Sequence, residues 1–413
     1  MSNPFPPTSF PKNEIKVLLL EDVHPSAVEL FGGEGFQVER VPGALKEADL
    51  VEKVRDVHVL GIRSKTQVTP RVLDEARRLL ALGAFCIGTN QVALGRANGR
   101  GVPVFNAPFS NTRSVAEMIL AEVIVLSRQL FDRSREVHGG TWKKLALGCH
   151  EIRGKTLGIV GYGHIGRQIG VLAEMIGMRV EFFDIAARLP MGNNSSVSTL
   201  DGLLATSDFV TLHVPETPQT RGMIGAGELA KMKKGACLLN ASRGSVVDLV
   251  ALADAIRGGH VGGAAVDVHP EEPESNSDGF GSVLRALPNV VLTPHIGGST
   301  EEAQEAIGRE VAASLIKFVN TGASTGAVNF PNIELPQAAG THRILNVHRN
   351  VPGVIRDITT IISDRGANIH AQVLATDPDI GYLIVDLDQE VSHDVKDAVS
   401  ALDTSIRTRI VYA

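Results

Sequence analysis

The stretch that decides the fold runs from Thr156 to Gly166 and reads TLGIVGYGHIG. Its first five residues form an apolar run typical of a buried strand, and a G-x-G-x-x-G motif follows directly. In such a unit Gly161 allows the tight turn, Gly163 lets the backbone approach a pyrophosphate, and Gly166 allows the helix to pack closely on the strand. The free N–H groups at the helix N-terminus would hold the anion. The stretch predicts a dinucleotide-binding unit, although the motif alone also occurs in ordinary glycine-rich loops.

The next predicted strand, residues 179–183, ends in Asp184. An acid about 20 residues after the glycine motif accepts hydrogen bonds from the adenosine ribose hydroxyls. Because it also repels a 2′-phosphate, NAD is favoured over NADP. Arg188 is the one nearby residue that would suit a 2′-phosphate. The alternative is that Asp184 is only a turn residue at the end of a strand.

Strands and helices alternate on both sides of this unit. Apolar runs at residues 15–20 and 57–62 have helical patterning between and after them, and the alternation recurs from 156 to about 292. This order predicts two Rossmann-like α/β domains with doubly wound parallel sheets. A capping-box pattern, Ser114 to Glu117, opens a helix that we expect to continue to about Phe131. A second helix, about 301–319, would carry the chain back to the first domain.

The last part of the chain has a different pattern. Residues 321–340 are rich in Gly, Ser, Pro, Asn and Ala and predict a linker. Strand 344–348, helix 352–365, strands 369–375 and 382–387, helix 392–402 and strand 406–411 then give a ferredoxin-like βαββαβ order. Asn350 is placed for the N-cap of the first helix, Pro352 for its first turn and Gly366 just past its end. The predicted domains are 1–110 with 297–335 for substrate, 111–296 for NAD, and 340–413 for regulation.

Composition excludes several classes of protein. With 413 residues, 43% hydrophobic and 21% charged, the chain has the balance of a soluble globular enzyme of two or three domains. The net charge of −6 contains no basic block for nucleic acid, and no apolar run reaches the roughly 18 residues of a membrane span. The start lacks a secretion signal, so we expect a cytoplasmic protein without nucleic-acid or membrane partners. Neither the three scattered cysteines nor the histidines have metal-ligand spacing, so no metal is predicted.

Three further segments each follow an apolar strand. They contain Arg243 (in LLNASRGS), Glu272 (in VDVHPEEP) and His295 (in LTPHIGGST). In an open α/β sheet ligands bind outside the carboxyl ends of the strands, so these three side chains could converge on one ligand. Taken singly they read as a surface ion-pair partner, a solvated loop acid and a helix-cap histidine. Together, downstream of a dinucleotide unit, they indicate a catalytic site.

Nearly the whole chain resembles the D-isomer-specific 2-hydroxyacid dehydrogenases. The resemblance rests on GYGHIG, NASRG, the Pro-Glu-Glu-Pro segment, PHIGGST and NTRSVAE. It implies that Arg243, Glu272 and His295 are catalytic and that the βαββαβ domain is an ACT domain. It also implies a homo-oligomer, with a tetramer favoured. The implied cofactor contacts are Gly161, Gly163, His164, Ile165, Gly166, Asp184, Ala241, Ser242, Arg243, Asp267, His295, Gly297 and Gly298.

The chemistry explains the choice of residues. Oxidation of an alcohol needs a base that takes the hydroxyl proton as hydride leaves, and histidine titrates near the working pH. A neighbouring Glu272 would orient His295 and raise its pKa. The planar fork of Arg243 suits the substrate carboxylate, a geometry that lysine cannot match.

The resemblance further implies NAD-dependent oxidation of 3-phospho-D-glycerate to 3-phosphohydroxypyruvate, the first step of L-serine biosynthesis. Arg63 and Lys65 are suitable cations for the phosphate, with Ser64 and Asn111 as hydrogen-bond donors. The alternative is that the cations are solvated surface residues. Some relatives have arginine where this chain has Lys65, so point-charge binding is expected in place of a bidentate contact. His213 matches another family segment, where a structural role is as plausible as ligand contact.

In the last domain His348, Asn350 and Asn368 match positions at which relatives bind L-serine across two paired ACT domains. Amide side chains can serve both the ammonium and the carboxylate of a free amino acid. Feedback inhibition by L-serine is therefore expected. Two alternatives remain open: another D-2-hydroxyacid dehydrogenase of the glycerate, glyoxylate or 2-hydroxyglutarate type, and a non-enzymatic NAD-sensing relative.

Overall fold

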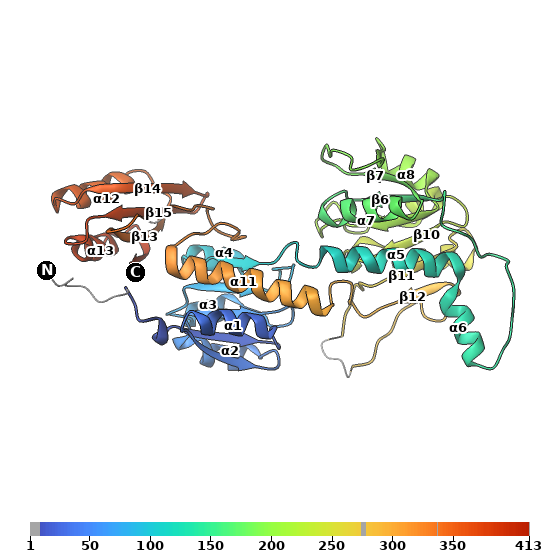
Figure 1. Ribbon diagram of the computed structural model, residues 1–413, viewed down its shortest axis with the longest axis horizontal. Helices are drawn as coiled ribbons and strands as arrows, with labels where there is room; N and C mark the ends of the chain where they lie inside the picture. Colours follow the sequence, from blue (N-terminus) through green and yellow to red (C-terminus); the bar gives the residue numbers. More distant parts are fainter. Residues whose placement is uncertain (1–8, 274–277, 337, 413) are drawn as a thin grey trace. The chain divides into compact units, whose positions relative to one another are not determined.

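The computed structural model describes residues 9–273, 278–336 and 338–412. The chain folds into two compact units (Figure 1). The first combines residues 1–110 with 304–413, and the second is the continuous segment 111–303. The predicted fold class, two parallel-sheet α/β folds with a ferredoxin-like domain, is confirmed. Within the described residues no helix is long and apolar enough to cross a bilayer.

The first unit begins with a five-stranded parallel sheet in the order β2-β1-β3-β4-β5. Helices α1 and α11 cover one face and α2, α3 and α4 the other, as the two clusters of buried side chains show. The strands are β1 (Lys16–Leu20), β2 (Gln37–Val41), β3 (Val59–Ile62), β4 (Ala81–Ala84) and β5 (Val104–Asn106). The helices are η1 (Lys12–Glu14), α1 (Pro25–Gly33), α2 (Glu47–Lys53), η2 (Val54–Asp56), α3 (Pro70–Glu75), α4 (Leu94–Gly99) and α11 (Glu301–Thr321).

The second unit has a seven-stranded parallel sheet in the order β12-β11-β10-β9-β6-β7-β8. Counted from β6, this is the strand order of dinucleotide-binding folds. Helices α5 and α7 pack on one face, and α8, α9 and α10 on the other. The strands are β6 (Thr156–Val160), β7 (Arg179–Phe183), β8 (Ser195–Ser196), β9 (Phe209–Leu212), β10 (Cys237–Asn240), β11 (Gly263–Val266) and β12 (Val290–Leu292). The helices are α5 (Thr112–Arg128), α6 (Leu130–His138), α7 (His164–Met175), α8 (Leu200–Thr206), α9 (Ala226–Lys231), η3 (Gly244–Val246) and α10 (Leu249–Arg257).

The helix expected to run from Ser114 to Phe131 differs from the prediction in two ways. It begins at Thr112, and the hydroxyl of Ser114 lies 2.8 Å from that of Thr300, so the capping box is wrong. It ends at Arg128 because Gln129 has φ 51°, in the left-handed region, and α6 starts afterwards as a separate helix. A glutamine in this conformation is uncommon, which is why the break could not be read from the residue types.

The ACT domain is a four-stranded antiparallel sheet in the order β14-β15-β13-β16. Its elements are β13 (His342–Arg349), α12 (Val354–Asp364), β14 (Ile369–Thr376), β15 (Ile380–Leu387), α13 (Ser392–Ser400) and β16 (Ser405–Val411). Helices α12 and α13 cover one face. The N-cap of α12 is Gly353, with φ 97°, so the N-cap role considered for Asn350 is wrong.

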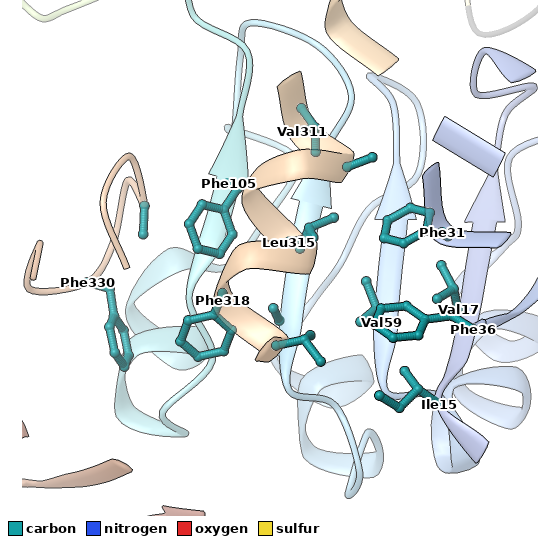
Figure 2. Packing of buried hydrophobic residues seen from close by; sticks show 14 of the residues in the cluster. Ile15, Val17, Phe31, Phe36, Val59, Phe105, Val311, Leu315, Phe318 and Phe330 are labelled. Carbon is teal, nitrogen blue, oxygen red and sulfur yellow. The ribbon is translucent and has the colours of Figure 1, made fainter. Parts of the chain in front are cut away.

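The other face of the ACT sheet shares a single apolar core with the first α/β sheet. Phe318 of α11 packs on Phe105 of β5 with ring centroids 5.9 Å apart (Figure 2). Phe330 packs edge-on against Tyr382 of β15, with ring centroids 5.1 Å apart. The segment expected to be a linker is thus partly core, since both Phe330 and Ile333 are buried.

A buried ion pair strengthens this connection. Arg343 of β13 is paired with Asp386 of β15 at 2.7 Å, and the two side chains are 1% and 0% exposed. The guanidinium also donates to the carbonyls of Thr321, Leu335 and Pro336. Because removal of one partner leaves a buried charge, such a change typically costs about 3–5 kcal/mol.

Candidate active site

The glycine loop between β6 and α7 satisfies the requirements that the sequence suggested. Gly161 has φ 93°, and a Cβ atom there would lie 2.4 Å from the carbonyl oxygen of His213. A Cβ on Gly166 would lie 2.4 Å from the carbonyl oxygen of Gly161. At Gly163, just before the first residue of α7, a Cβ would meet no described atom within 4 Å. Two glycines are needed by the protein's own packing, and the third leaves the approach to the helix N-terminus open, as a pyrophosphate requires.

Asp184 is fixed beside this loop at the end of β7. One carboxylate oxygen accepts from the backbone N–H of Tyr162 within the loop, at 2.9 Å, and the other accepts from that of Ala186. Arg188 donates to the same carboxylate at 3.3 Å. The acid is therefore part of the glycine-loop architecture, and Arg188, which would have suited a 2′-phosphate, is neutralised by it. The adjacent predicted contacts His164, exposed, and Ile165, half-buried, form the first turn of α7.

The carboxyl ends of the central strands lie at one edge of the sheet. The register pairs Leu212 of β9 with Asn240 of β10, Asn240 with Val266 of β11, and Val266 with Leu292 of β12. Parallel strands in this register deliver the loops that follow them to the same place. The three predicted catalytic residues come from the loops after β10, β11 and β12.

The turn after β10 is organised by buried Asn240. Its side-chain oxygen accepts from the N–H and hydroxyl of Ser242, and its amide donates to the carbonyl of Arg243 at 3.0 Å. A Cβ on Gly244 would lie 2.1 Å from the carbonyl carbon of His269, so only glycine fits the next position. The turn places Arg243 in the extended conformation with Ser242 buried and Ala241 half-buried.

His295 and Glu272 form the hydrogen-bonded pair that the sequence suggested. His295 Nδ1 lies 2.9 and 3.0 Å from the two carboxylate oxygens of Glu272. Glu272 also accepts from the backbone N–H of His269 at 3.3 Å. Both side chains are partly exposed, 49% for the histidine and 40% for the acid, so a ligand can reach them.

The charge of Arg243 also influences this pair. The hydrogen bond to Glu272 raises the pKa of His295; burial opposes this, the charges of Glu272 and Asp267 add to the rise, and the charge of Arg243 acts against it. Partial burial tends to raise the pKa of Glu272, but the hydrogen bond and charge of His295 outweigh it and lower that pKa. The imidazole is thus under the opposed influence of an acid and a guanidinium.

The loop that carries His295 is held by Asp267. His295 has φ 56°, a left-handed conformation that is uncommon for residues other than glycine. The backbone of Asp267 accepts from the N–H of His295 at 2.8 Å, and its two carboxylate oxygens accept from the N–H groups of Ile296 and Gly297, each at 2.8 Å. Asp267 is 2% exposed, so these contacts support a positioning role for this predicted cofactor residue.

A further predicted residue, Asn111, lies beside Gly298 of the same loop. A Cβ atom at Gly298 would lie 2.2 Å from the side-chain nitrogen of Asn111, which precedes α5. Asn111, predicted to contact substrate, therefore packs against the segment that follows His295. His213 has its Nε2 2.8 Å from the hydroxyl of Thr211, and burial lowers its pKa to about 3.

Glu122, on α5, is a residue that sequence reasoning missed. It is 6% exposed, and burial raises its pKa to about 8, with the charge of Asp267 adding to the shift. A neutral carboxyl group can therefore lie close to Asp267 at ordinary pH. The only sequence signal was an acid on the apolar face of a helix, a pattern that does not reveal its partner.

The remaining predicted substrate residues lie in the other compact unit, in the loop after β3. Arg63 is half-buried, and Ser64 and Lys65 are exposed. The backbone N–H groups of Arg63 and Lys65 donate to the buried carboxylate of Glu21. Glu21, which receives them, was not predicted as a functional residue.

The predicted effector residues are not brought together within one chain. The side chain of Asn350 donates to the carbonyl of Asp377, and its N–H to that of Asp379, just before β15. The N–H of Asn368 donates to Asp388, just after β15. An eight-residue strand separates such ends by roughly 24 Å. His348 is buried, with its Nδ1 2.9 Å from Asn346 Oδ1.

Comparisons with known families agree with this architecture. The family described as "D-isomer specific 2-hydroxyacid dehydrogenase, NAD binding domain" matches residues 120–297, and an "AHAS small subunit-like ACT domain" matches residues 344–407. The fold and the matched domain define an NAD-dependent oxidoreductase, and the predicted cofactor, NAD, is confirmed.

Individual relatives place the chain more narrowly. It is 58% identical to a D-3-phosphoglycerate dehydrogenase of Dictyostelium discoideum over 98% of this chain and 100% of that one, and 50% identical to the Escherichia coli K12 enzyme of the same name over 98% and 99%. Among solved structures, the TT0316 protein of Thermus thermophilus matches with a TM-score of 0.67 at 30% identity, covering 74% of this chain and 97% of its own. A D-lactate dehydrogenase of Aquifex aeolicus complexed with NAD and lactic acid matches with a TM-score of 0.64 at 26% identity, covering 73% and 95%. The chain belongs to the D-isomer specific 2-hydroxyacid dehydrogenase family.

Proposed function

We propose that this chain is a D-3-phosphoglycerate dehydrogenase, which oxidises 3-phospho-D-glycerate to 3-phosphohydroxypyruvate with NAD in the first step of L-serine biosynthesis. The observation that carries the proposal is the His295–Glu272 pair under the influence of Arg243, at the carboxyl edge of the dinucleotide-binding sheet. Full-length similarity to chains of that name supports the choice of substrate.

His295 is the proposed base. Because its Nδ1 faces Glu272, Nε2 is the ring nitrogen that takes the proton of the substrate's C2 hydroxyl. Glu272 keeps the ring in this orientation and stabilises the imidazolium that forms. NAD, when bound, would supply the acceptor for the hydride that leaves C2. The alcohol thus loses one proton to His295 and one hydride, and a carbonyl remains.

Arg243 and the cofactor residues have complementary proposed roles. The guanidinium binds the substrate carboxylate and stabilises the C2 oxygen as its carbonyl forms. The open approach at Gly163 and the acid at Asp184 would hold the pyrophosphate and the adenosine ribose. Ala241, Ser242, Gly297 and Gly298 would line the remainder of the cofactor site.

The phosphate group of the substrate distinguishes the proposed reaction from the reactions of dehydrogenases that act on unphosphorylated acids. We assign it to Arg63, Ser64 and Lys65, with Asn111 as a further donor. In this assignment residues 1–110 with 297–335 form the substrate domain, 111–296 the NAD domain and 340–413 the regulatory domain. A dehydrogenase for an unphosphorylated acid would not need the two cations.

We also propose L-serine as an effector. Asn350 and Asn368 lie at opposite ends of β15, which supports a site formed by two ACT domains, each contributing one end. His348 is buried, so it would support the proposed effector site from inside the domain.

A homo-oligomer, with a tetramer favoured, forms part of the proposal. The stretch from α6 to the loop after it exposes Phe131 by 53%, Val137 by 54%, Trp142 by 83% and Leu147 by 84%. Large apolar side chains gathered in this way mark an interaction surface. A cytoplasmic location also forms part of the proposal, because the three cysteines scattered over the sequence form no even disulfide framework.

The test is NADH formation by the purified chain with 3-phospho-D-glycerate, D-glycerate and D-2-hydroxyglutarate, with and without L-serine. We expect much higher kcat/KM with the phosphorylated acid, and inhibition by serine. Equal rates with D-glycerate would favour the alternative dehydrogenases, and no reduction of NAD with any substrate would favour a nicotinamide-sensing protein.

A further inference from the structure

Glu21 lies directly after β1 and directs its side chain into the loop that follows β3. One carboxylate oxygen, Oε1, accepts from the backbone N–H groups of Arg63 at 3.2 Å and Thr66 at 2.8 Å. The other, Oε2, accepts from the N–H of Lys65 at 3.0 Å. The residue is 8% exposed. A single buried carboxylate therefore receives three of the four N–H groups of residues 63–66.

The backbone around Glu21 is built to make this contact. Glu21 has φ 63° and Asp22 has φ 49°, two consecutive residues in the left-handed region where neither is a glycine. Such conformations persist only where the surroundings enforce them. Here the N–H of Glu21 donates to the carbonyls of Val41 and Gly43, and its own carbonyl accepts from the guanidinium of Arg63 at 3.4 Å. The strain is confined to the point where the chain turns the carboxylate toward the loop.

A second buried side chain also forms a hydrogen bond with the backbone of this loop. Gln91 is 6% exposed and donates its amide to the carbonyl of Arg63 at 2.7 Å. Three N–H groups and one carbonyl of the loop are thus bonded to buried side chains, while the side chains of Ser64 and Lys65 remain exposed. Three of the four N–H groups that could have formed an anion-binding nest are already committed to Glu21, so an anion outside the loop must be bound mainly by side chains.

We propose that Glu21 is the positioning residue of the substrate loop: its carboxylate holds residues 63–66 so that the side chains of Arg63, Ser64 and Lys65 face the phosphate of the substrate. This inference rests on the proposed function, which assigns those three side chains to the phosphate. Glu21 acts through the loop and does not touch the substrate.

The charge and the two oxygens of Glu21 are both required. Glutamine has the same shape, but its amide group would direct N–H bonds at either the N–H of Lys65 or those of Arg63 and Thr66. A donor facing a donor leaves a buried polar group unsatisfied. Glu21→Gln should therefore release the loop without removing bulk from the core.

The experiment compares Glu21→Gln with Glu39→Gln, a matched change at an exposed carboxylate on β2 that pairs with Lys53. Two quantities are measured in the full chain: hydrogen–deuterium exchange of the amides in residues 63–66, and KM for 3-phospho-D-glycerate and for NAD. In Glu21→Gln we expect faster exchange in the loop and a KM for 3-phospho-D-glycerate raised roughly tenfold or more, with KM for NAD close to that of the control. If Glu21 had only a structural role, its replacement would lower kcat and the melting temperature without raising KM for 3-phospho-D-glycerate more than KM for NAD.

Two outcomes would overturn the inference, and they can be told apart. Unchanged exchange in the loop would show that Glu21 does not hold it. Faster exchange with an unchanged KM for 3-phospho-D-glycerate would show that the loop does not bind the substrate, which also removes the phosphate assignment from the proposed function. If Glu21→Gln does not fold, Glu21→Asp, which keeps the charge but is one methylene shorter, gives the same two measurements. If the wild-type chain oxidises no substrate, the proposed function and the substrate part of the inference are rejected, while faster exchange in Glu21→Gln would still show that Glu21 holds the loop.

Discussion

The proposed catalytic residues and the proposed effector residues of this chain are arranged in opposite ways. Arg243, Glu272 and His295 come from three loops of one parallel sheet, and strand register alone brings those loops together. Asn350 and Asn368 lie at the two ends of one strand, and the fold keeps them apart. The difference teaches that the nucleotide-binding unit can assemble its proposed chemical groups within one chain, whereas the proposed effector residues would need a second copy of the chain to meet.

The largest expected effect concerns the proposed catalytic residues, which all come from one chain. His295→Ala removes the proposed base while leaving Glu272 and the strands unchanged, so kcat should fall on the order of a hundredfold or more. Steady-state NADH formation with 3-phospho-D-glycerate measures it, and NAD binding monitored by fluorescence serves as the control. Near-normal turnover would remove His295 from the chemistry.

A smaller loss is expected for Arg243→Lys. Lysine retains the positive charge but not the planar pair of donors for the carboxylate, so kcat/KM should fall by roughly tenfold or more. The same assay measures it, and the pH of half-maximal activity should shift little because the charge beside His295 is kept. Wild-type kcat/KM in this variant would show that no bidentate contact is made.

The effector side of the comparison predicts complementation between two defective chains. Asn350→Ala and Asn368→Ala should each weaken inhibition by L-serine, with little effect on uninhibited turnover. When the two variants are co-expressed and assemble, one ACT pair can combine the intact Asn350 of one chain with the intact Asn368 of the other. Partial recovery of serine inhibition in the mixed oligomer is expected. No recovery would mean that both residues act within the same chain.

The sequence predicted the parts of the site that depend on local backbone geometry. Gly161 and Gly166 are needed because a Cβ would collide with nearby backbone, and this requirement is visible in the motif itself. The ferredoxin-like order of the last domain was also predictable, since its strands and helices have clear periodicity. NAD followed from the acid at Asp184.

Other features could not be read because they depend on contacts between distant segments. Glu21 receives N–H groups from residues more than 40 positions away. The charge of Asp267, which follows β11, acts on Glu122 of α5, more than 140 positions earlier in the chain. The break at Gln129 depends on a left-handed backbone torsion that this residue type only weakly favours. The packing of residues 321–336 against the ACT sheet was hidden by a composition typical of linkers.

The most direct test of the central claim is the pH dependence of kcat/KM for 3-phospho-D-glycerate oxidation, compared between the wild-type chain and Glu272→Gln. The base must be neutral to accept a proton, so the oxidation rate should rise with pH through the pKa of His295, which Glu272 raises. Without the carboxylate that pKa falls, and the rise should move to lower pH while the plateau rate decreases. An unchanged midpoint, or a shift to higher pH, would contradict the account, because the imidazole and the carboxylate would then not act as a pair.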